Sequence, residues 1–322
     1  MNGKNKIYMK EWLKIREMSL EPILKWAGGK RSLISEIMAL FPPDYRARRY
    51  HEPFFGGGAV FFKIMPKSGT INDINNRLMN FYTVVRDHPE KLIEMANQYK
   101  HDKETYYKLR DRFNQPGLSN IKDASLLLYL NKTAYNGLYR VNSSGGFNVP
   151  FGRYKNPNIV PEERIRAVSR ILKNVKIYNN DFSYVVDYAE KGDLCYFDPP
   201  YQPVSSTANF TSYSSDGFDF TDQIRLCKTC LDLDSNGVYF ILSNSFVSEI
   251  IDLYIDIDSF RVEVVQANRA ISSKVSTRGP IYEILVTNIP KEISIGDIVI
   301  QYRFKRLKKE SNFDNIIKFT PK

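Results

Sequence analysis

The sequence predicts an α/β fold: a mostly parallel mixed sheet with helices on both faces, interrupted by a helical insertion. Short strand patterns recur along the chain with helical patterns between several of them. A glycine-rich turn joins an early strand to a helix, and one long central stretch is helical in pattern. At 322 residues and 43% hydrophobic content, the chain can bury the core of one large domain or two moderate ones.

The first part of the chain alternates helix and strand patterns. Residues 23–30 form a glycine-containing loop that opens a helix over 32–40, where apolar residues recur at helical spacing until two prolines end the pattern. Residues 49–64 comprise a short strand, a glycine-rich turn and a helix, and residues 69–75 form a strand that ends in a polar turn. This order, closed by an acidic residue, is typical of one half of a nucleotide-binding α/β domain.

The middle of the chain has a different character. Residues 76–132 are helical in pattern, whereas 135–155 hold glycines, tyrosines and basic residues with almost no periodic face, which predicts a compact, functional loop region. Strand patterns return further on, at residues 175–178, 194–197, 238–242, 260–265 and 281–286. A helical insertion near residues 76–165 therefore interrupts the α/β domain.

Charge and composition restrict the class of partner. Lys and Arg number 46 against 36 Asp and Glu, which suits a polyanionic partner, although a surplus that serves solubility would look the same. No stretch approaches the roughly 20 apolar residues that span a bilayer, and the N-terminus lacks a signal-peptide core, so we expect a cytoplasmic protein without a membrane partner. Cys227 and Cys230 are expected on one face of a helix, and no metal site is predicted.

The most informative motif is Asp198-Pro199-Pro200-Tyr201, directly after the apolar strand pattern 194–197. Functional sites in open α/β sheets gather at the carboxyl ends of strands. Two consecutive prolines have no backbone N–H and a fixed φ, so their carbonyls become rigid acceptors that suit an amine donor.

An exocyclic amino group on a base is a poor nucleophile because its lone pair is delocalised into the ring. If the Asp198 carboxylate and the Pro199 carbonyl accept its two hydrogens, the lone pair can turn toward a methyl donor. Tyr201 offers a face on which an unstacked base can lie. The alternative interpretation of the motif is a Pro-Pro turn with a helix-capping Asp.

The glycine turn at residues 56–58 favours a cofactor without phosphates. It permits close backbone approach but lacks both the Gly-x-Gly-x-x-Gly spacing of dinucleotide sites and the Gly-Lys-Ser/Thr ending of phosphate loops. Asp73 is a candidate for binding a ribose diol, Glu52 for orienting the loop or facing a positive charge on the cofactor, and Lys30 for pairing with a free carboxylate. Each of these residues alone is also compatible with an ordinary turn or cap.

Three motifs in order resemble the Dam-like (alpha, D12 class) family of DNA adenine methylases, especially the GATC-modifying members found in type II restriction systems. They are Lys-Trp-Ala-Gly-Gly-Lys at 25–30, Glu-Pro-Phe-Phe-Gly-Gly-Gly-Ala at 52–59, and Asp-Pro-Pro-Tyr at 198–201. The resemblance covers residues 20–290. It implies a Rossmann-like S-adenosylmethionine-dependent domain at residues 1–75 with 166–290 and a target-recognition domain at residues 76–165. Residues 291–322 form a lysine-rich, basic C-terminal extension, to which the resemblance assigns no role.

The resemblance also implies a role for particular residues. The tetrad Asp198, Pro199, Pro200 and Tyr201 would be catalytic. The cofactor site would comprise Trp26, Lys30, Glu52, Phe54, Gly56, Gly58, Asp73, Asp181, Phe182 and Asp198. Lys30 would lie near the methionine carboxylate, Asp73 on the ribose hydroxyls, and Asp181 on the amino group of the cofactor's adenine.

Residues 135–153 resemble the recognition segment of GATC methylases. The DNA contacts implied there are Tyr135, Asn136, Leu138, Arg140, Asn142, Pro150 and Arg153. A separate polar, basic loop at 272–279 resembles a family loop near the DNA and adds Lys274 and Arg278. Arg140 would bond a guanine edge in the major groove, Leu138 and Pro150 would meet thymine methyls, and Tyr135 with Asn136 would wedge into the duplex. Arg153, Lys274 and Arg278 would hold phosphates, which positions the protein without specifying sequence.

Other functions share part of this pattern. N4-cytosine methylation uses the same acceptor geometry, but those enzymes more often resemble Ser-Pro-Pro-Tyr, and protein glutamine methylases resemble Asn-Pro-Pro-Tyr. A non-catalytic DNA-binding protein on a methylase scaffold is the alternative from another class. The expected partner is double-stranded DNA, bound by a monomer with no obligate protein partner; a cognate restriction endonuclease would accompany a restriction-system role.

Overall fold

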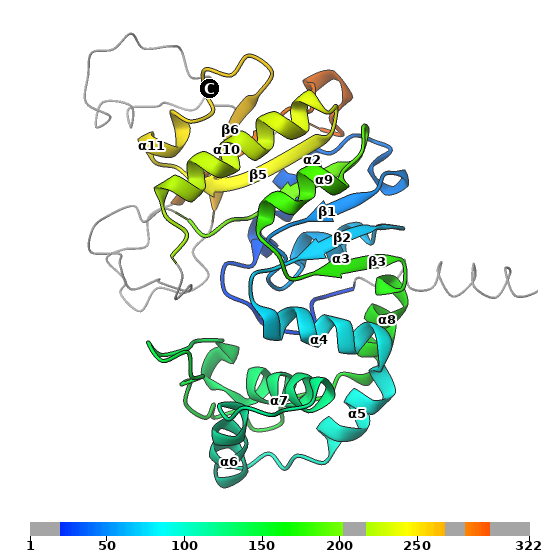
Figure 1. Cartoon of the computed structure of the whole chain (residues 1–322), viewed down its shortest axis with the longest axis vertical. Helices are drawn as coiled ribbons and strands as arrows, with labels where there is room; N and C mark the ends of the chain where they lie inside the picture. Colours follow the sequence, from blue (N-terminus) through cyan, green and yellow to red (C-terminus); the bar gives the residue numbers. More distant parts are fainter. Residues whose placement is uncertain (1–19, 202–216, 268–280, 297–322) are drawn as a thin grey trace, which may run out of the picture.

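The computed structural model describes residues 20–201, 217–267 and 281–296, and its centre is a seven-stranded sheet (Figure 1). The strand order is β3-β2-β1-β4-β5-β7-β6. All neighbouring pairs from β3 to β5 are parallel, and β7 lies antiparallel between β5 and β6. The strands are β1 Tyr50–Glu52, β2 Gly69–Asn72, β3 Val175–Tyr178, β4 Leu194–Phe197, β5 Tyr239–Ser245, β6 Arg261–Ala267 and β7 Ile281–Thr287. The predicted α/β class with a mostly parallel mixed sheet is confirmed.

The central strands are buried on both faces. Every residue of β1, β2 and β4 is buried, as expected for parallel strands covered by helices on each side. At Gly69, a Cβ atom would come within 1.7 Å of the Tyr50 carbonyl oxygen, and φ is +145°. Only glycine therefore allows β2 to start this close to β1.

Helices cover both faces of the sheet. Tyr196 of β4 points into a core shared with α2, α3, α4 and α8, whereas its neighbours Cys195 and Phe197 point into a second core beneath α9, α10 and α11. Both Cys227 and Cys230 face this second core from α10, as predicted. The helices are α2 Ile34–Ala39, α3 Ala59–Ile64, α4 Asn76–Asp87, α5 Pro89–Asn97, α6 Lys103–Phe113, α7 Asn120–Thr133, α8 Glu162–Leu172, α9 Val185–Tyr188, α10 Phe220–Ser235 and α11 Ser248–Ile251.

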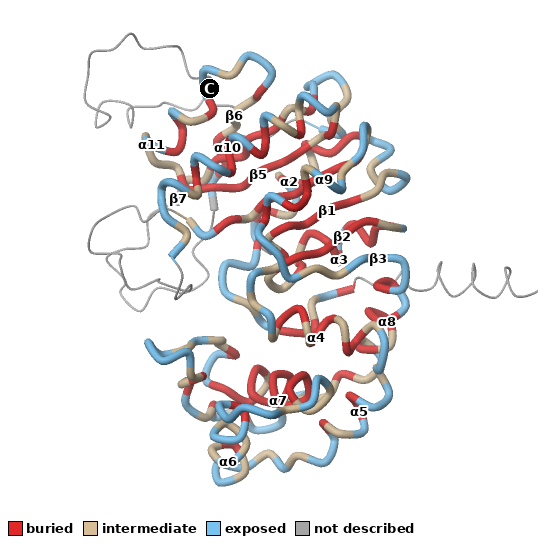
Figure 2. Tube along the Cα trace, in the orientation of Figure 1, coloured by how far each residue is buried: buried red, intermediate tan, exposed pale blue. Residues whose placement is uncertain are grey.

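The helical insertion lies at one end of the molecule (Figure 1). Helices α5, α6 and α7 form it, while α4 packs both on α7 and on β3, so that it joins the insertion to the sheet. Figure 2 shows α7 buried along most of its length, which makes it the centre of the insertion. The helical pattern predicted over 76–132 is confirmed; the division of the chain into a catalytic and a recognition domain stays a prediction.

Two predicted elements differ in detail from the structure. The helix expected over 32–40 begins as a 3₁₀ turn, Lys30–Leu33, before α2. The strand expected over 238–242 continues to Ser245, because the antiparallel partner β7 extends its ladder. Across the described ranges, none of the helices has the length and apolar character needed to cross a membrane.

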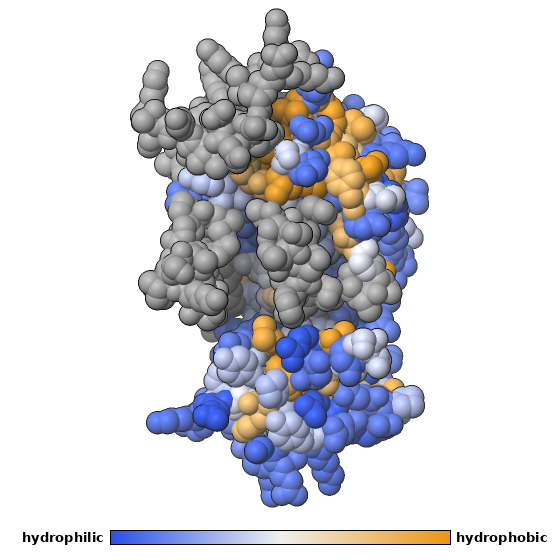
Figure 3. All heavy atoms as spheres, turned by 90° about the vertical axis from the view of Figure 1, so that its left-hand side faces the viewer, coloured by the Kyte–Doolittle hydropathy of each residue, from blue (hydrophilic) through white to orange (hydrophobic). Residues whose placement is uncertain are grey.

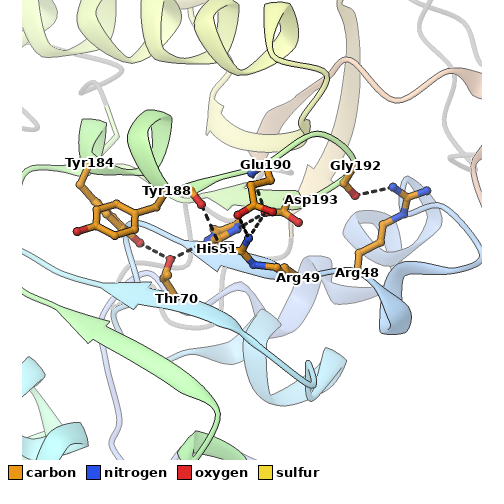
Figure 4. Close-up of polar contacts among 9 residues, drawn as sticks. All are labelled: Arg48, Arg49, His51, Thr70, Tyr184, Tyr188, Glu190, Gly192 and Asp193. Carbon is orange, nitrogen blue, oxygen red and sulfur yellow. Dashed lines mark hydrogen bonds and ion pairs between the residues drawn. The ribbon is translucent and has the colours of Figure 1, made fainter.

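A buried polar network links three central strands (Figure 4). The ring of His51 on β1 contacts Thr70 Oγ1 on β2 at 2.8 Å through Nδ1, and Asp193 Oδ2 just before β4 at 3.0 Å through Nε2. Thr70 is in turn 2.7 Å from the Tyr184 hydroxyl. A candidate site residue ends β1 and directly follows β2 and β4, so the network helps to hold the strands that carry these residues in register.

Candidate active site and nucleic-acid interface

The candidate site lies along the carboxyl edge of the sheet. Strands β3, β2, β1 and β4 are parallel neighbours, so the segments that follow them emerge side by side. Glu52 ends β1, Asp73 follows β2, Asp181 follows β3, and Asp198 follows β4. Strand pairing thus gathers four acidic side chains that are distant in the sequence.

The tetrad is held by contacts from three other segments. Lys30 Nζ pairs with Asp198 Oδ1 at 2.8 Å, and Gln223 Nε2 of α10 donates to the Pro200 carbonyl at 3.1 Å. The Tyr201 hydroxyl donates to Glu283 Oε2 of β7 at 2.5 Å. Neither Gln223 nor Glu283 is part of a recognisable sequence motif, and neither residue was predicted from the sequence.

Burial governs the electrostatics of the acidic groups. Burial raises the pKa of Asp198, the neighbouring Lys30 ammonium lowers it, and the charge on Glu283 raises it further. Burial also raises the pKa of Glu52 well above its ordinary value, although the Tyr50 hydroxyl, donating to Glu52 Oε2 at 2.7 Å, opposes that shift. The Lys30 cation is therefore the group that favours an ionised Asp198.

The glycine turn is fixed against both Trp26 and Asp73. A Cβ atom on Gly56, where φ is +49°, would lie 3.0 Å from the Trp26 ring, and one on Gly58 would lie 2.5 Å from the Phe55 ring. Asp73 Oδ2 accepts from the Gly56 N–H at 2.9 Å, while its Oδ1 accepts from the Asn75 N–H at 2.9 Å. Asp73 thus binds the turn directly, and burial raises its pKa.

Asp181 and Phe182 form the third part of the edge. Asp181 caps the turn that follows it through the Ser183 N–H and also pairs with Arg225 of α10 at 2.8 Å. Burial alone would raise the pKa of Asp181, but Ser183 and Arg225 lower it. The Phe182 ring stacks on Phe54 with centroids 5.3 Å apart, and the Arg225 guanidinium lies 5.0 Å from the Phe182 ring. Arg225 was not predicted from the sequence.

The candidate interface is the loop between α7 and α8, whose backbone is pinned. The Tyr135 N–H donates to the Pro150 carbonyl at 2.9 Å, and Asn148 N–H donates to the Arg140 carbonyl at 3.1 Å. The side-chain amide of Asn114, at the end of α6, bonds both the N–H and the carbonyl of Phe147. The loop therefore has a defined shape, although its regular structure in the described residues is limited to a 3₁₀ turn, Tyr135–Gly137, and two isolated bridges.

Most of the predicted DNA-contacting side chains in this loop point outward. Tyr135 is 54% exposed, and Asn136, Arg140, Pro150 and Arg153 are also exposed, whereas Leu138 is half-buried. In Figure 3 the part of the visible face that holds the insertion is mainly hydrophilic. Asn142 is exposed too, but its Oδ1 accepts from the Ser144 and Gly146 N–H groups and so shapes a turn. Lys274 and Arg278 lie outside the described residues.

The loop and the active-site edge are physically connected. Trp26 of the first motif stacks on Tyr139 of the loop, with centroids 5.0 Å apart. The side chain of Asn131 on α7 accepts from the Lys25 N–H at 2.9 Å and donates to the Lys25 carbonyl at 2.7 Å. The N-terminal motif therefore bridges the sheet and the insertion.

Known proteins resemble the chain over most of its length. Residues 26–271 match the family described as D12 class N6 adenine-specific DNA methyltransferase. The chain is 44% identical over 283 residues to a type II methyltransferase of Lactococcus lactis subsp. cremoris, covering 86% of this chain and 98% of the relative. It is 42% identical over 291 residues to a type II methyltransferase of Methanocaldococcus jannaschii, covering 84% and 100%.

A relative of another kind, a DNA adenine methylase of Vibrio cholerae, is 35% identical over 275 residues, covering 83% of this chain and 95% of the relative. The family match and the three relatives span both the sheet edge with the tetrad and the insertion. The chain belongs to the D12 class of N6 adenine-specific DNA methyltransferases.

Proposed function

We propose that the chain transfers a methyl group from S-adenosylmethionine to the exocyclic amino group of an adenine flipped out of double-stranded DNA, and that its target sequence is GATC. The observation that carries the proposal is the tetrad at the carboxyl edge of β4, pinned by Lys30, Gln223 and Glu283, in a chain of the adenine-specific family. This arrangement keeps an acceptor carboxylate fixed beside an aromatic platform.

The side chains around the glycine turn support S-adenosylmethionine as the methyl donor. Asp73 is an acceptor suited to a ribose diol, and Asp181 is one suited to an adenine amino group. Ile74, between β2 and α4, places an apolar side chain that is 70% exposed next to Asp73 in the chain. The turn follows none of the phosphate-binding patterns, and Lys30 suits a carboxylate. These chemical types match the parts of the proposed donor, which would supply an electrophilic methyl group on a sulfonium.

The tetrad residues would act by position and electrostatics. The Asp198 carboxylate and the Pro199 carbonyl would accept the two hydrogens of the target amino group, which frees the nitrogen lone pair and stabilises the positive charge that develops there. The Tyr201 ring would support the unstacked base from one face. Lys30 would keep Asp198 ionised by its charge.

The loop between α7 and α8 supports recognition of duplex DNA. Its backbone is fixed, while Arg140 is exposed and its Nε donates to Asn148 Oδ1 at 2.8 Å. The guanidinium is thereby oriented from one edge, and Arg is the commonest partner for a guanine edge in the major groove. We propose that residues 76–165 form the target-recognition domain, with Arg153 on phosphate and Tyr135 with Asn136 at the site of base flipping.

The proposed setting is a monomer acting on DNA in the cytoplasm, without an obligate protein partner. The type II methyltransferases among its relatives favour a restriction-modification role with a cognate endonuclease. Like its relative in Vibrio cholerae, which is a DNA adenine methylase, it would modify adenine.

The chemical test is the identity of the modified nucleoside. The protein is incubated with S-adenosylmethionine and unmethylated duplex DNA, which is then digested to nucleosides and analysed by mass spectrometry. We expect N6-methyladenine. N4-methylcytosine would instead support the cytosine alternative, and binding of DNA without any methylated nucleoside would support a non-catalytic DNA-binding protein.

A further inference from the structure

Strand β7 brings an acidic side chain to the active-site edge from the far end of the chain. Because β7 runs antiparallel to β5, its beginning lies where β5 ends, and Glu283 is opposite Ser245, the last residue of β5. Since β5 is a parallel neighbour of β4, this is also the edge at which Asp198 emerges. Glu283 is thus placed beside the tetrad by topology alone.

The contacts of Glu283 are with the tetrad and its cation. Glu283 Oε2 accepts from the Tyr201 hydroxyl at 2.5 Å and lies 4.0 Å from Lys30 Nζ. Lys30 Nζ is 2.8 Å from Asp198 Oδ1 and 4.3 Å from the centroid of the Tyr201 ring. The side chains of Lys30, Asp198 and Glu283 are only 9%, 20% and 16% exposed, so bulk water screens these interactions little.

This geometry gives the Tyr201 hydroxyl a fixed acceptor, and it gives the Lys30 ammonium a second carboxylate, more distant than that of Asp198. A hydrogen bond from a phenol to a carboxylate is among the short, strong ones, and it holds the tyrosine ring in one plane. Gln223 fixes the backbone of the tetrad at Pro200, and it is itself held by Asn244 Nδ2 at 2.9 Å.

We propose that Glu283 is a positioning residue for methyl transfer, which orients the Tyr201 ring as the platform for the target base and retains Lys30 against Asp198. The inference rests on the proposed function, because the platform matters only if a base enters the site. Glu283 does not touch the reacting atoms; it acts through Tyr201 and Lys30. A substitution of Glu283 should therefore have its main effect on the rate of the chemical step rather than on binding of DNA.

The test compares Glu283→Ala, Glu283→Gln, Tyr201→Phe and the double variant Glu283→Ala with Tyr201→Phe. Single-turnover methylation of duplex DNA is measured at saturating S-adenosylmethionine. We expect Glu283→Ala to lower the rate about 10- to 100-fold, as for loss of a charged hydrogen bond. Glu283→Gln keeps a hydrogen-bond acceptor and should retain more activity, and it is the working variant if Glu283→Ala unfolds.

The double variant separates a positioning role from a general structural one. If Glu283 acts through the Tyr201 hydroxyl, the methylation rate of the double variant should fall no further than that of the less active single variant. A second measurement uses 2-aminopurine in place of the target adenine. The fluorescence of 2-aminopurine is quenched less when the base stacks poorly on Tyr201. The emission of the DNA complex of Glu283→Ala should therefore exceed that of the wild-type complex, while DNA affinity stays within about threefold of wild type.

Glu263→Gln is the matched control. Glu263 lies on the neighbouring strand β6, and its carboxylate pairs with Arg261 at 3.3 Å, away from the tetrad. Its rate should stay within about twofold of wild type. Two outcomes would overturn the role of Glu283 but leave the proposed function standing. One is a Glu283→Ala variant as active as an active wild type; the other is a double variant whose fold-loss in rate is the product of the two single fold-losses. A wild type that methylates no DNA would overturn the proposed function itself.

Discussion

The proposed active-site edge and the proposed recognition loop are constructed in opposite ways. At the edge, the side chains of Lys30, Asp198 and Glu283 are largely buried, and Lys30 pairs with both carboxylates. In the loop, the backbone is held by hydrogen bonds, while the side chains of Tyr135 and Arg140 are exposed to solvent and Arg140 is bonded at its Nε by Asn148. Chemistry on a weak nucleophile needs acceptors that do not reorganise, whereas reading DNA needs side chains that can reach base edges from a fixed backbone.

Substitution at the edge should therefore affect chemistry far more than binding, and Asp198→Ala is expected to have the largest effect. Without its acceptor carboxylate, the single-turnover methylation rate should fall by about 100- to 1,000-fold or more. DNA affinity should change little, since Asp198 is not in the loop. The control is Asp187→Ala, which removes an exposed carboxylate on α9. A similar loss of methylation rate in both variants would contradict a specific role for Asp198.

Substitution in the loop should alter specificity, with Arg140→Ala as the next largest effect. Loss of a bidentate base contact should weaken discrimination at one guanine by about 10- to 100-fold, measured by competition between GATC duplexes and duplexes altered at that position. Arg153→Ala should instead weaken binding of all sequences and reduce the dependence of affinity on salt. If the two variants behave alike, the distinction between base reading and phosphate binding is wrong.

The buried His51 network offers a third kind of region, whose role is predicted to be structural. His51→Phe leaves Asp193 without its imidazole partner and should lower the free energy of unfolding by about 1–3 kcal/mol, measured by urea denaturation. His88→Phe, at an exposed position between α4 and α5, should change it by less than about 0.5 kcal/mol. An equal effect of both substitutions would show that the network adds no stability.

The smallest expected effect is a displacement of the pH dependence. Because burial raises the pKa of Asp198, acidification should protonate it and reduce methylation at a higher pH than for an ordinary aspartate. Lys30→Met removes the cation that lowers this pKa, so the acid limb of the single-turnover rate profile should move to higher pH. Lys63→Met, at an exposed site on α3, should leave it in place; movement toward lower pH in Lys30→Met would contradict the account.

Sequence alone predicted those parts of the molecule whose residues are contiguous. The tetrad, the glycine turn and the alternation of helix and strand can be recognised because each depends on neighbours in the chain. The confirmed sheet and the helical pattern over 76–132 belong to this group.

The residues that support the site could not be predicted in this way. Gln223 and Arg225 come from a helix, and Glu283 from a strand whose antiparallel place between β5 and β6 exists only after folding. The patterns around them are those of an ordinary helix and strand. Their role becomes visible only when the sheet brings them within hydrogen-bonding distance of Pro200, Asp181 and Tyr201.

The most direct test of the central claim uses unmethylated plasmid DNA incubated with the protein and S-adenosylmethionine. Parallel samples are digested with a nuclease that GATC adenine methylation blocks and with one that requires it. We predict protection from the first and new cleavage by the second, both lost in Asp198→Ala. Unchanged digestion by both nucleases, with active protein and bound S-adenosylmethionine, would contradict GATC as the target and with it the assignment of Arg140.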